Sequence, residues 1–472
     1  MTSVSAPSVA HASIARLRQG FRDGSLSARA LLEAAIENHG RHGGALNGYR
    51  HFDGEGARRL ATAADAAIAA GADTGPLMGI PVAVKDVFGV DGMPFYAGTP
   101  APFGPEWQAD SAIVRHWRNQ LSPITGKAHT VEFALGVIGT NPHAGAPRNP
   151  WGGADHRVCG GSTSGGGPIL HEGSASLVLG TDSGGSVRIP ASLTGCVGIR
   201  TSIGRWTMAG GMTLSPSIDS ASLLARTMDD LIEGCAGTDP TLAHLAGLSA
   251  DPAAAELHGI TIGVADESFW RDCGPGVAEA VRAALAELER AGARLVDLPL
   301  PEAQLAIEFS RNGGLTVPEV YHTVTSRFPE RVKGMDPNVW ARLSGLGDIP
   351  AGEYMRRRAA VRQMVADVDK RFDAVDLIAA PTTPITAPRV EDVATPETYR
   401  AHNVLMSRNT YIGNLADTPA VSLVAGLDPN GLPIGLQLSA RRMGEEALLL
   451  VARRAERVLG TAAERIGHPA FG

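Results

Sequence analysis

Apolar residues recur along this chain in two patterns, which predict helices and short buried strands. In residues 27–39 and 55–70, alanine and leucine return at helical spacing. Ser27 is suited to cap the first of these helices, and Gly71 is suited to end the second. Residues 79–90 form instead a short run rich in valine and isoleucine, which is typical of a buried strand.

The same alternation continues toward the C-terminus. An amphipathic helix is predicted at 275–291 between strands at 259–265 and 294–298, which together make a βαβ unit. Core strands are also predicted at 377–380 and 421–424. These strands imply that the C-terminal part of the chain returns to the main sheet.

Residues 305–350 contain several glycines and prolines and show no clear periodicity. They therefore predict no defined helix or strand. A strongly charged helix is predicted directly after them, over 354–371.

Composition indicates an ordinary globular protein and excludes some function classes. The 472 residues are 44% hydrophobic and 19% charged, and their net charge is -7. An acidic chain without a basic run is a poor general partner for nucleic acid, because binding phosphates needs a basic face. Neither a secretory signal nor a membrane span is evident, so a cytoplasmic protein is predicted.

The four cysteines lie far apart in the sequence, at Cys159, Cys196, Cys235 and Cys273. No C-x-x-C pair suggests a structural metal site, and the wide spacing does not indicate a disulfide framework. Buried free thiols are the expected state.

Residues 177–190, LVLGTDSGGSVRIP, combine a strand, a glycine loop, a serine and the start of a helix. Gly184 and Gly185 permit backbone angles that turn several N–H groups to one side, and Pro190 suits a first helical turn. Ser186 is a candidate nucleophile, because acyl transfer places a negative charge on an oxygen that such N–H groups can bind. The alternative is a tight turn with an incidental serine.

Lys85 lies inside the predicted strand at 79–90 and is one of only four lysines in the chain. A two-residue period places it on the same face as Ala83, which leaves room for the ammonium group. Burial lowers the pKa of a lysine, so Lys85 can serve as a neutral base near pH 7. An ion pair with a buried carboxylate is the alternative explanation.

Residues 159–167, CGGSTSGGG, form a second loop rich in glycine and serine. It lacks the terminal Lys-Ser/Thr of a P-loop and the spacing of a dinucleotide fingerprint, which argues against a nucleotide site. The loop presents the hydroxyls of Ser162, Thr163 and Ser164.

Taken together, these segments resemble the amidase signature family. The likeness rests on GIPVAVKD at 79–86, GGSTSGG at 160–166 and GTDSGGSVRIP at 180–190, in that order. Shorter matches at 124–134, 149–151, 198–205, 381–384 and 431–437 extend it over most of the chain. Ser162 and Ser186 are 186 − 162 = 24 positions apart, as are the paired serines of the family.

The resemblance implies a triad in which Ser186 is the nucleophile and Lys85 is the base. Ser162 is the bridging serine, on a cis peptide bond after Gly161. Physical chemistry agrees with this assignment, because an intervening hydroxyl that accepts one proton and gives another lets a distant lysine reach the nucleophile.

The resemblance also implies supporting residues around the triad. The implied oxyanion hole consists of the backbone amides of Ser183, Gly184, Gly185 and Ser186. The residues implied to brace the site are Asp182 and Arg188, which hold the loop, and Thr163, which stands where a serine commonly orients the lysine.

Three departures place the chain outside the most typical branch of the family. The loop reads GGSTSGG where GGSSGGS is usual, Cys159 replaces a proline, and Arg-Thr-Ser at 200–202 replaces Lys-Pro-Thr. These departures weaken any inference about the substrate that is carried over from the family.

The fold implied by the resemblance is α/β, a single large domain over residues 1–472. A twisted mixed β-sheet is expected, covered by helices on both faces. Residues 76–230 form the signature core with the triad, 235–375 are a variable substrate-entrance region, and 376–472 return to the sheet.

The function implied is that of a serine hydrolase, without cofactor or metal, that cleaves C–N bonds of small amides. Esters are expected substrates as well. Small carbamates (urethanes) are also expected, because the triad is intact, the glycine loop departs from that of the tRNA-amidating type, and no charged signature in the loops demands an ionic substrate. Neither nucleic acid nor membrane is an expected partner, and a monomer or homodimer is expected. The alternatives are an amidotransferase subunit of the tRNA-amidating type, which delivers ammonia to a partner, and an inactive binding scaffold.

Overall fold

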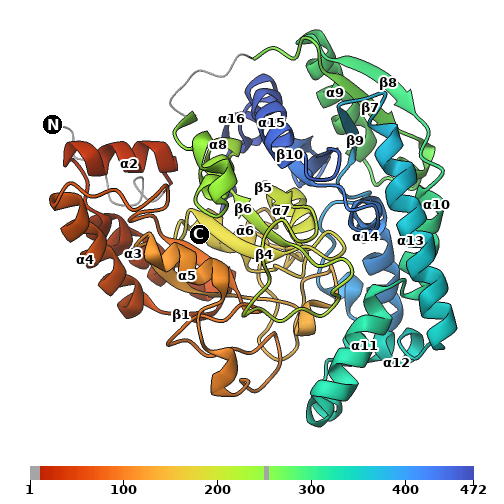
Figure 1. Cartoon of the computed structure of the whole chain (residues 1–472), viewed down its shortest axis with the longest axis horizontal. Helices are drawn as coiled ribbons and strands as arrows, with labels where there is room; N and C mark the ends of the chain where they lie inside the picture. Colours follow the sequence, from red (N-terminus) through yellow and green to blue (C-terminus); the bar gives the residue numbers. More distant parts are fainter. Residues whose placement is uncertain (1–10, 249–254, 472) are drawn as a thin grey trace.

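In the described part of the chain, one mixed sheet of eleven strands runs through the molecule and carries helices on both faces (Figure 1). The computed structural model describes residues 11–248 and 255–471. The strands are β1 (Tyr49–Phe52), β2 (Val82–Lys85), β3 (Ile124–Ala128), β4 (Leu177–Thr181), β5 (Val197–Arg200), β6 (Ala221–Ala225), β7 (Thr261–Ala265), β8 (Arg294–Leu298), β9 (Leu377–Pro381), β10 (Ala420–Leu427) and β11 (Pro433–Ser439).

Their order in the sheet is β1-β3-β2-β4-β6-β5-β10-β11-β9-β7-β8. The neighbours β3-β2, β2-β4, β9-β7 and β7-β8 are parallel, and the other pairs are antiparallel. The predicted mixed α/β sheet is therefore confirmed, and the C-terminal strands β10 and β11 lie in its middle.

The helices are α2 (Ile14–Asp23), α3 (Ala28–Leu46), α4 (Gly54–Ala69), α5 (Ala112–Asn119), α6 (Gly166–Glu172), α7 (Arg188–Thr194), α8 (Met228–Ala236), α9 (Val277–Arg290), α10 (Ala303–Asn312), α11 (Thr316–Arg327), α12 (Pro337–Leu346), α13 (Ala351–Arg371), α14 (Pro396–Leu415), α15 (Glu445–Leu459) and α16 (Ala462–Ile466). No described helix combines the length and the hydropathy that a membrane span requires.

The two faces of the sheet carry two separate apolar clusters, because side chains alternate along a strand. Val82 and Val84 belong to the larger core, on the face covered by α8, α9 and α15. Ala83 and Val178 belong to a smaller cluster with Ile169 of α6 and Ala191 of α7. The short helices α6 and α7 thus lie against the face on which Ala83 projects.

Most elements predicted from the periodicity are present. Ser27 caps α3 by accepting a hydrogen bond from the N–H of Ala30, and β7, α9 and β8 form the predicted βαβ unit. The predicted strand at 79–90 is much shorter, because the chain turns after Lys85, whose carbonyl accepts from the N–H of Val87 at 2.7 Å. Cys159, Cys196 and Cys235 are buried free thiols, whereas Cys273 is only partly buried.

Residues 305–350, for which no element was predicted, are largely helical in α10, α11 and α12. Helix α11 is rich in threonine and valine and contains Pro318, so its intrinsic helix propensity is low. Its buried residues Val317, Val320 and Val324 nevertheless recur at helical spacing, and packing against neighbouring helices outweighs propensity. Helices α10 and α12 lie beside α14, and α11 packs against α12 (right-hand side of Figure 1).

Candidate active site

Lys85 is the last residue of β2, and its side chain is completely buried. Its Nζ donates to Ser162 Oγ at 2.7 Å and to Thr181 Oγ1 at 2.7 Å. Thr181 ends β4, the parallel neighbour of β2, so both strands end at the same edge of the sheet. The lysine is thus held between two hydroxyl groups.

The structure contradicts the ion-pair explanation for Lys85, because no described carboxylate lies within ion-pair distance of it. Lys127 on β3 is the contrasting case, since its Nζ lies 3.0 Å from Asp86 Oδ1 and both side chains are buried. Burial lowers the pKa of Lys85 to about 7 from its ordinary value of 10.5, while the negative charges of Asp182 and Asp219 limit the fall. The Lys85 side chain can therefore be uncharged near pH 7.

Ser162 lies in the glycine loop before α6, and the peptide bond between Gly161 and Ser162 is cis. The loop is held on both sides. The carbonyl of Ser162 accepts from Val131 N–H at 3.2 Å, and the N–H of Thr163 donates to the carbonyl of Ser186 at 3.2 Å. The backbone therefore brings the loops of the two serines together.

Ser186 lies in the loop that joins β4 to α7 and is 4% exposed. It lines a small cavity of about 40 Å³, together with Ser183 and Gly184. Its hydroxyl makes no hydrogen bond with any residue that the structure describes. The Ser186 oxygen is therefore available to a molecule in the cavity.

The four amides of the expected oxyanion hole are not equivalent. The N–H of Gly185 donates to Asp182 Oδ1 at 2.8 Å and is therefore already engaged. Within the described chain, the N–H groups of Ser183, Gly184 and Ser186 have no such partner. Gly185 has a φ of 114°, a conformation that favours glycine, and it shapes the loop.

Asp182 and Arg188 brace this loop from beneath as a fully buried pair. Arg188 Nε and Nη2 lie 3.0 and 2.9 Å from the two carboxylate oxygens of Asp182. Burial alone raises the pKa of Asp182, but the charge and hydrogen bonds of Arg188, the charge of Arg200 and a hydrogen bond from Asn414 together outweigh it and hold the pKa well below its usual range. The guanidinium also donates to Gln437 Oε1 on β11 at 2.8 Å and to Asn414 Oδ1 on α14 at 2.7 Å.

Thr163 does not have the orienting role expected for it. Its Oγ1 is buried without a hydrogen-bond partner in the described structure, close to the backbone of Gly180. Thr181 holds the lysine instead. The sequence gives only a weak signal for this residue, namely that Thr181 directly precedes Asp182 in the segment 177–190. The parallel pairing that brings it to Lys85 comes from the structure.

A wider cavity of about 600 Å³ adjoins the Ser186 cavity. Ser310, Arg342 and Asn403 line both cavities. The first two come from α10 and α12, within the expected substrate-entrance region at 235–375, and no sequence pattern singled them out. Arg342 forms no ion pair with an acid in the described residues, and Arg311 and Arg400 also line the wider cavity.

Comparison with known proteins gives a consistent result. A family model described as Amidase matches residues 30–449. The 2-amino-5-chloromuconic acid deaminase of Comamonas testosteroni is 41% identical over 460 residues, which cover 98% of this chain and 99% of that protein. A glutamyl-tRNA(Gln) amidotransferase subunit from Nocardia farcinica (strain IFM 10152) is 30% identical over 487 residues, covering 94% of this chain and 98% of that one.

Solved structures agree over similar lengths. One described as an amidase has a TM-score of 0.83 at 27% identity and covers 95% of this chain and 100% of that chain. 6-Aminohexanoate cyclic dimer hydrolase complexed with substrate has a TM-score of 0.80 at 23% identity and covers 97% of this chain and 99% of that chain. The second likeness concerns the fold alone.

Proposed function

Because this chain belongs to the amidase family, we propose that it hydrolyses a C–N bond of a small molecule through a covalent intermediate on Ser186. The observation that carries the proposal is the buried hydrogen bond of 2.7 Å from Lys85 Nζ to Ser162 Oγ. The loop of Ser162 is in turn joined to the loop of Ser186 by a backbone hydrogen bond. A lysine buried without an acid partner is suited to accept a proton.

In the proposed reaction, the Ser186 oxygen attacks the carbonyl carbon and its proton passes to Ser162, which gives its own proton to neutral Lys85. The N–H groups of the Ser186 loop bind the resulting oxyanion. The C–N bond then breaks as the proton returns through Ser162 to the leaving nitrogen. Water hydrolyses the acyl group from Ser186 by the same proton path and restores the serine.

Activity is expected to rise with pH up to about 7 and then to level off. Lys85 must be neutral to accept a proton, and its pKa is lowered to about 7. Below this value, kcat/KM for a neutral anilide should fall about tenfold per pH unit.

A Thr181→Val variant tests whether the midpoint of this pH dependence belongs to Lys85. Thr181 accepts a hydrogen bond from the Lys85 ammonium and so favours its charged form. Removing the hydroxyl should move the midpoint to lower pH. A flat profile from acid to alkali, or an unchanged midpoint in the variant, would contradict Lys85 as the base.

We also propose that the substrate carries a carboxylate. Arg342 lines the cavity of Ser186 and has no acidic partner among the described residues, so a substrate carboxylate can pair with it. The relative from Comamonas testosteroni is named for a carboxylic acid, which supports this class. In this proposal residues 76–230 supply the chemistry and residues 235–375, which include Arg342, supply the recognition.

Replacing Arg342 by methionine is expected to raise KM for a carboxylate-bearing anilide by about 10- to 100-fold, as loss of a charge-assisted hydrogen bond predicts. KM for the neutral methyl ester of the same anilide should change less than about threefold. Arg342→Lys keeps the charge and should restore part of the loss. Equal effects of Arg342→Met on both anilides would refute carboxylate recognition.

Hydrolysis of small urethanes and esters stays a prediction, because the same attack on a planar carbonyl would serve both. A matched set of anilide, urethane and ester, each with and without a carboxylate, tests it by release of the amine or alcohol. Amine released from the anilide but not from the urethane would leave a plain amidase. The tRNA-amidating alternative has weaker support, since the amidotransferase relative from Nocardia farcinica is less similar than the deaminase.

A further inference from the structure

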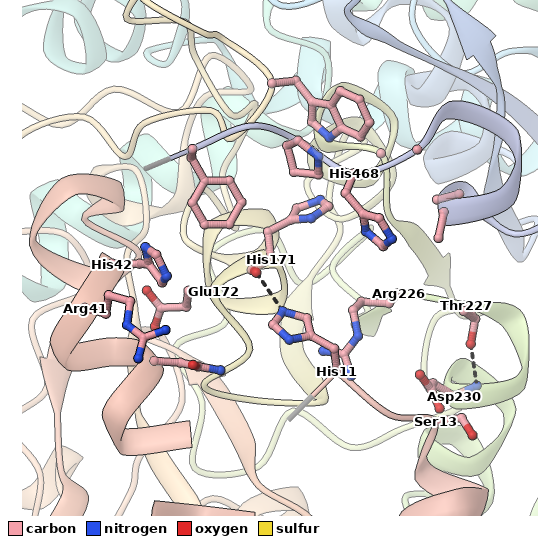
Figure 2. Close-up of a pocket in the computed structure, with 18 residues that line it drawn as sticks. His11, Ser13, Arg41, His42, His171, Glu172, Arg226, Thr227, Asp230 and His468 are labelled. Carbon is pink, nitrogen blue, oxygen red and sulfur yellow. Dashed lines mark hydrogen bonds between the residues drawn. The ribbon is translucent and has the colours of Figure 1, made fainter. Parts of the chain in front are cut away.

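A third cavity, of about 430 Å³, lies away from Ser186 and shares no lining residue with either cavity described above. Figure 2 shows side chains from several separate segments around it, including Arg41 of α3, Glu172 of α6, Asp230 of α8 and His468 near the C-terminus. Its wall also includes Trp151. The cavity is large enough for a small aromatic molecule.

Two buried polar atoms in the lining lack a partner in the described structure. Asn38 is 2% exposed and its Nδ2 is an unused donor. Glu172 is 1% exposed and its Oε2 is an unused acceptor, although Oε1 is bonded to His39 and Ser174. A buried donor and a buried acceptor are costly to leave unpaired, so the site calls for a ligand that offers both partners.

The charges of the lining select among small head groups. A carboxylate would face the unpaired oxygen of Glu172, which repels it. An ammonium would lie among Arg41 and Arg226, which also line the cavity. The carboxylate of Asp230 is already engaged, because it accepts from the N–H of Ile14 at 2.7 Å and interacts with the charge of Arg226. A neutral carboxamide avoids both conflicts, because its N–H can donate to Glu172 and its carbonyl can accept from Asn38.

The cavity also has apolar side chains that suit the body of such a ligand. The indole of Trp151 and the ring of Phe471 line the same cavity, and His42 meets Phe471 edge to face with ring centres 5.4 Å apart. Flat rings favour stacked or edge-on contact with another aromatic group. We propose that this cavity binds a neutral carboxamide with an aromatic or similarly flat apolar body, at a site separate from that of Ser186.

The wall of this cavity is also part of the support of the two serine loops. Helices α6 and α7 begin directly after those loops, and both end at the cavity. Trp151 Nε1 donates to the carbonyl of Thr194, the last residue of α7, at 3.0 Å. His171 Nε2 binds the same carbonyl at 2.5 Å. The cavity therefore lies at the far end of the helices that follow Ser162 and Ser186.

The test uses the full-length Ser186→Ala protein, so that no ligand is hydrolysed and the result does not depend on the proposed activity. Benzamide, benzoate and benzylamine share a ring and differ in head group. By calorimetry, benzamide should bind with a Kd on the order of 0.1–1 mM, and at least about tenfold more tightly than the other two. Crystals soaked with benzamide should show its amide group between Asn38 and Glu172.

Two variants locate the binding in solution. Asn38→Leu removes the unused donor at similar volume, and Ala463→Trp fills the cavity from the short helix α16. Each should weaken benzamide binding about tenfold, with Tm lowered by no more than about 3 °C. Benzamide found only near residue 186, undiminished binding in Ala463→Trp, or benzoate binding as tightly as benzamide would each overturn the proposal.

Discussion

Replacing Ser186 by alanine is expected to lower kcat by about 10⁴- to 10⁶-fold, the loss typical of removing a nucleophile from a triad. The change deletes the attacking oxygen and leaves the loop, because the hydroxyl has no hydrogen bond to a described residue. Release of amine from an anilide measures the loss. A fluorophosphonate should label the unaltered protein once per chain and fail to label the variant.

Ser192→Ala is the matched control for this experiment. Ser192 lies on α7, six positions after Ser186, and its buried Oγ also lacks a partner in the described structure. The same atom is deleted from the same segment, so activity should remain within about twofold. If Ser186→Ala keeps a tenth of the activity, Ser186 is not the nucleophile.

Replacing Lys85 by methionine should lower kcat/KM by about 10³- to 10⁴-fold, since the proton of Ser186 then has no base to receive it. Ser162→Ala should cost a similar factor. The double variant should lose little more than either single variant, because the two groups act in one relay. Losses that multiply in the double variant would show that the two act independently.

Lys127→Met is the comparison that separates catalysis from stability. Lys127 pairs with buried Asp86, so its loss leaves an uncompensated buried charge and should cost about 3–5 kcal/mol of unfolding free energy. Lys85 has no described acid partner, so Lys85→Met should leave the free energy of unfolding almost unchanged or raised. A large loss of stability in Lys85→Met would assign the lysine a structural role.

The three residues of the proposed triad stand out in the sequence because each depends on a local signal. Glycines mark the two loops, and a lysine in a strand of valine and alanine is conspicuous at Lys85. Two nearby expectations failed for a geometric reason, namely that Thr163 orients the lysine and that the Gly185 amide belongs to the oxyanion hole. Parallel strands β2 and β4 bring Thr181 to Lys85, and Asp182 occupies the N–H of Gly185, and neither fact is visible from spacing alone.

Recognition of the substrate was much less accessible to sequence reasoning. Arg342 lies 156 positions from Ser186, counted as 342 − 186, in a segment whose periodicity did not predict a helix. The loops carry no charged signature that would demand an ionic substrate, so the sequence did not point to a carboxylate. Packing of α12 against α14 places this arginine at the cavity, and that arrangement is tertiary.

The brace beneath the Ser186 loop has a consequence for synthesis of the protein. Arg188 is held by Asn414 and Gln437, so the loop gains its full support only when those late segments have folded onto the sheet. Ribosomes release a chain from its N-terminus onward. A growing polypeptide that already contains all three residues of the proposed triad should therefore remain without hydrolytic activity until Asn414 and Gln437 have been made and have folded onto the sheet.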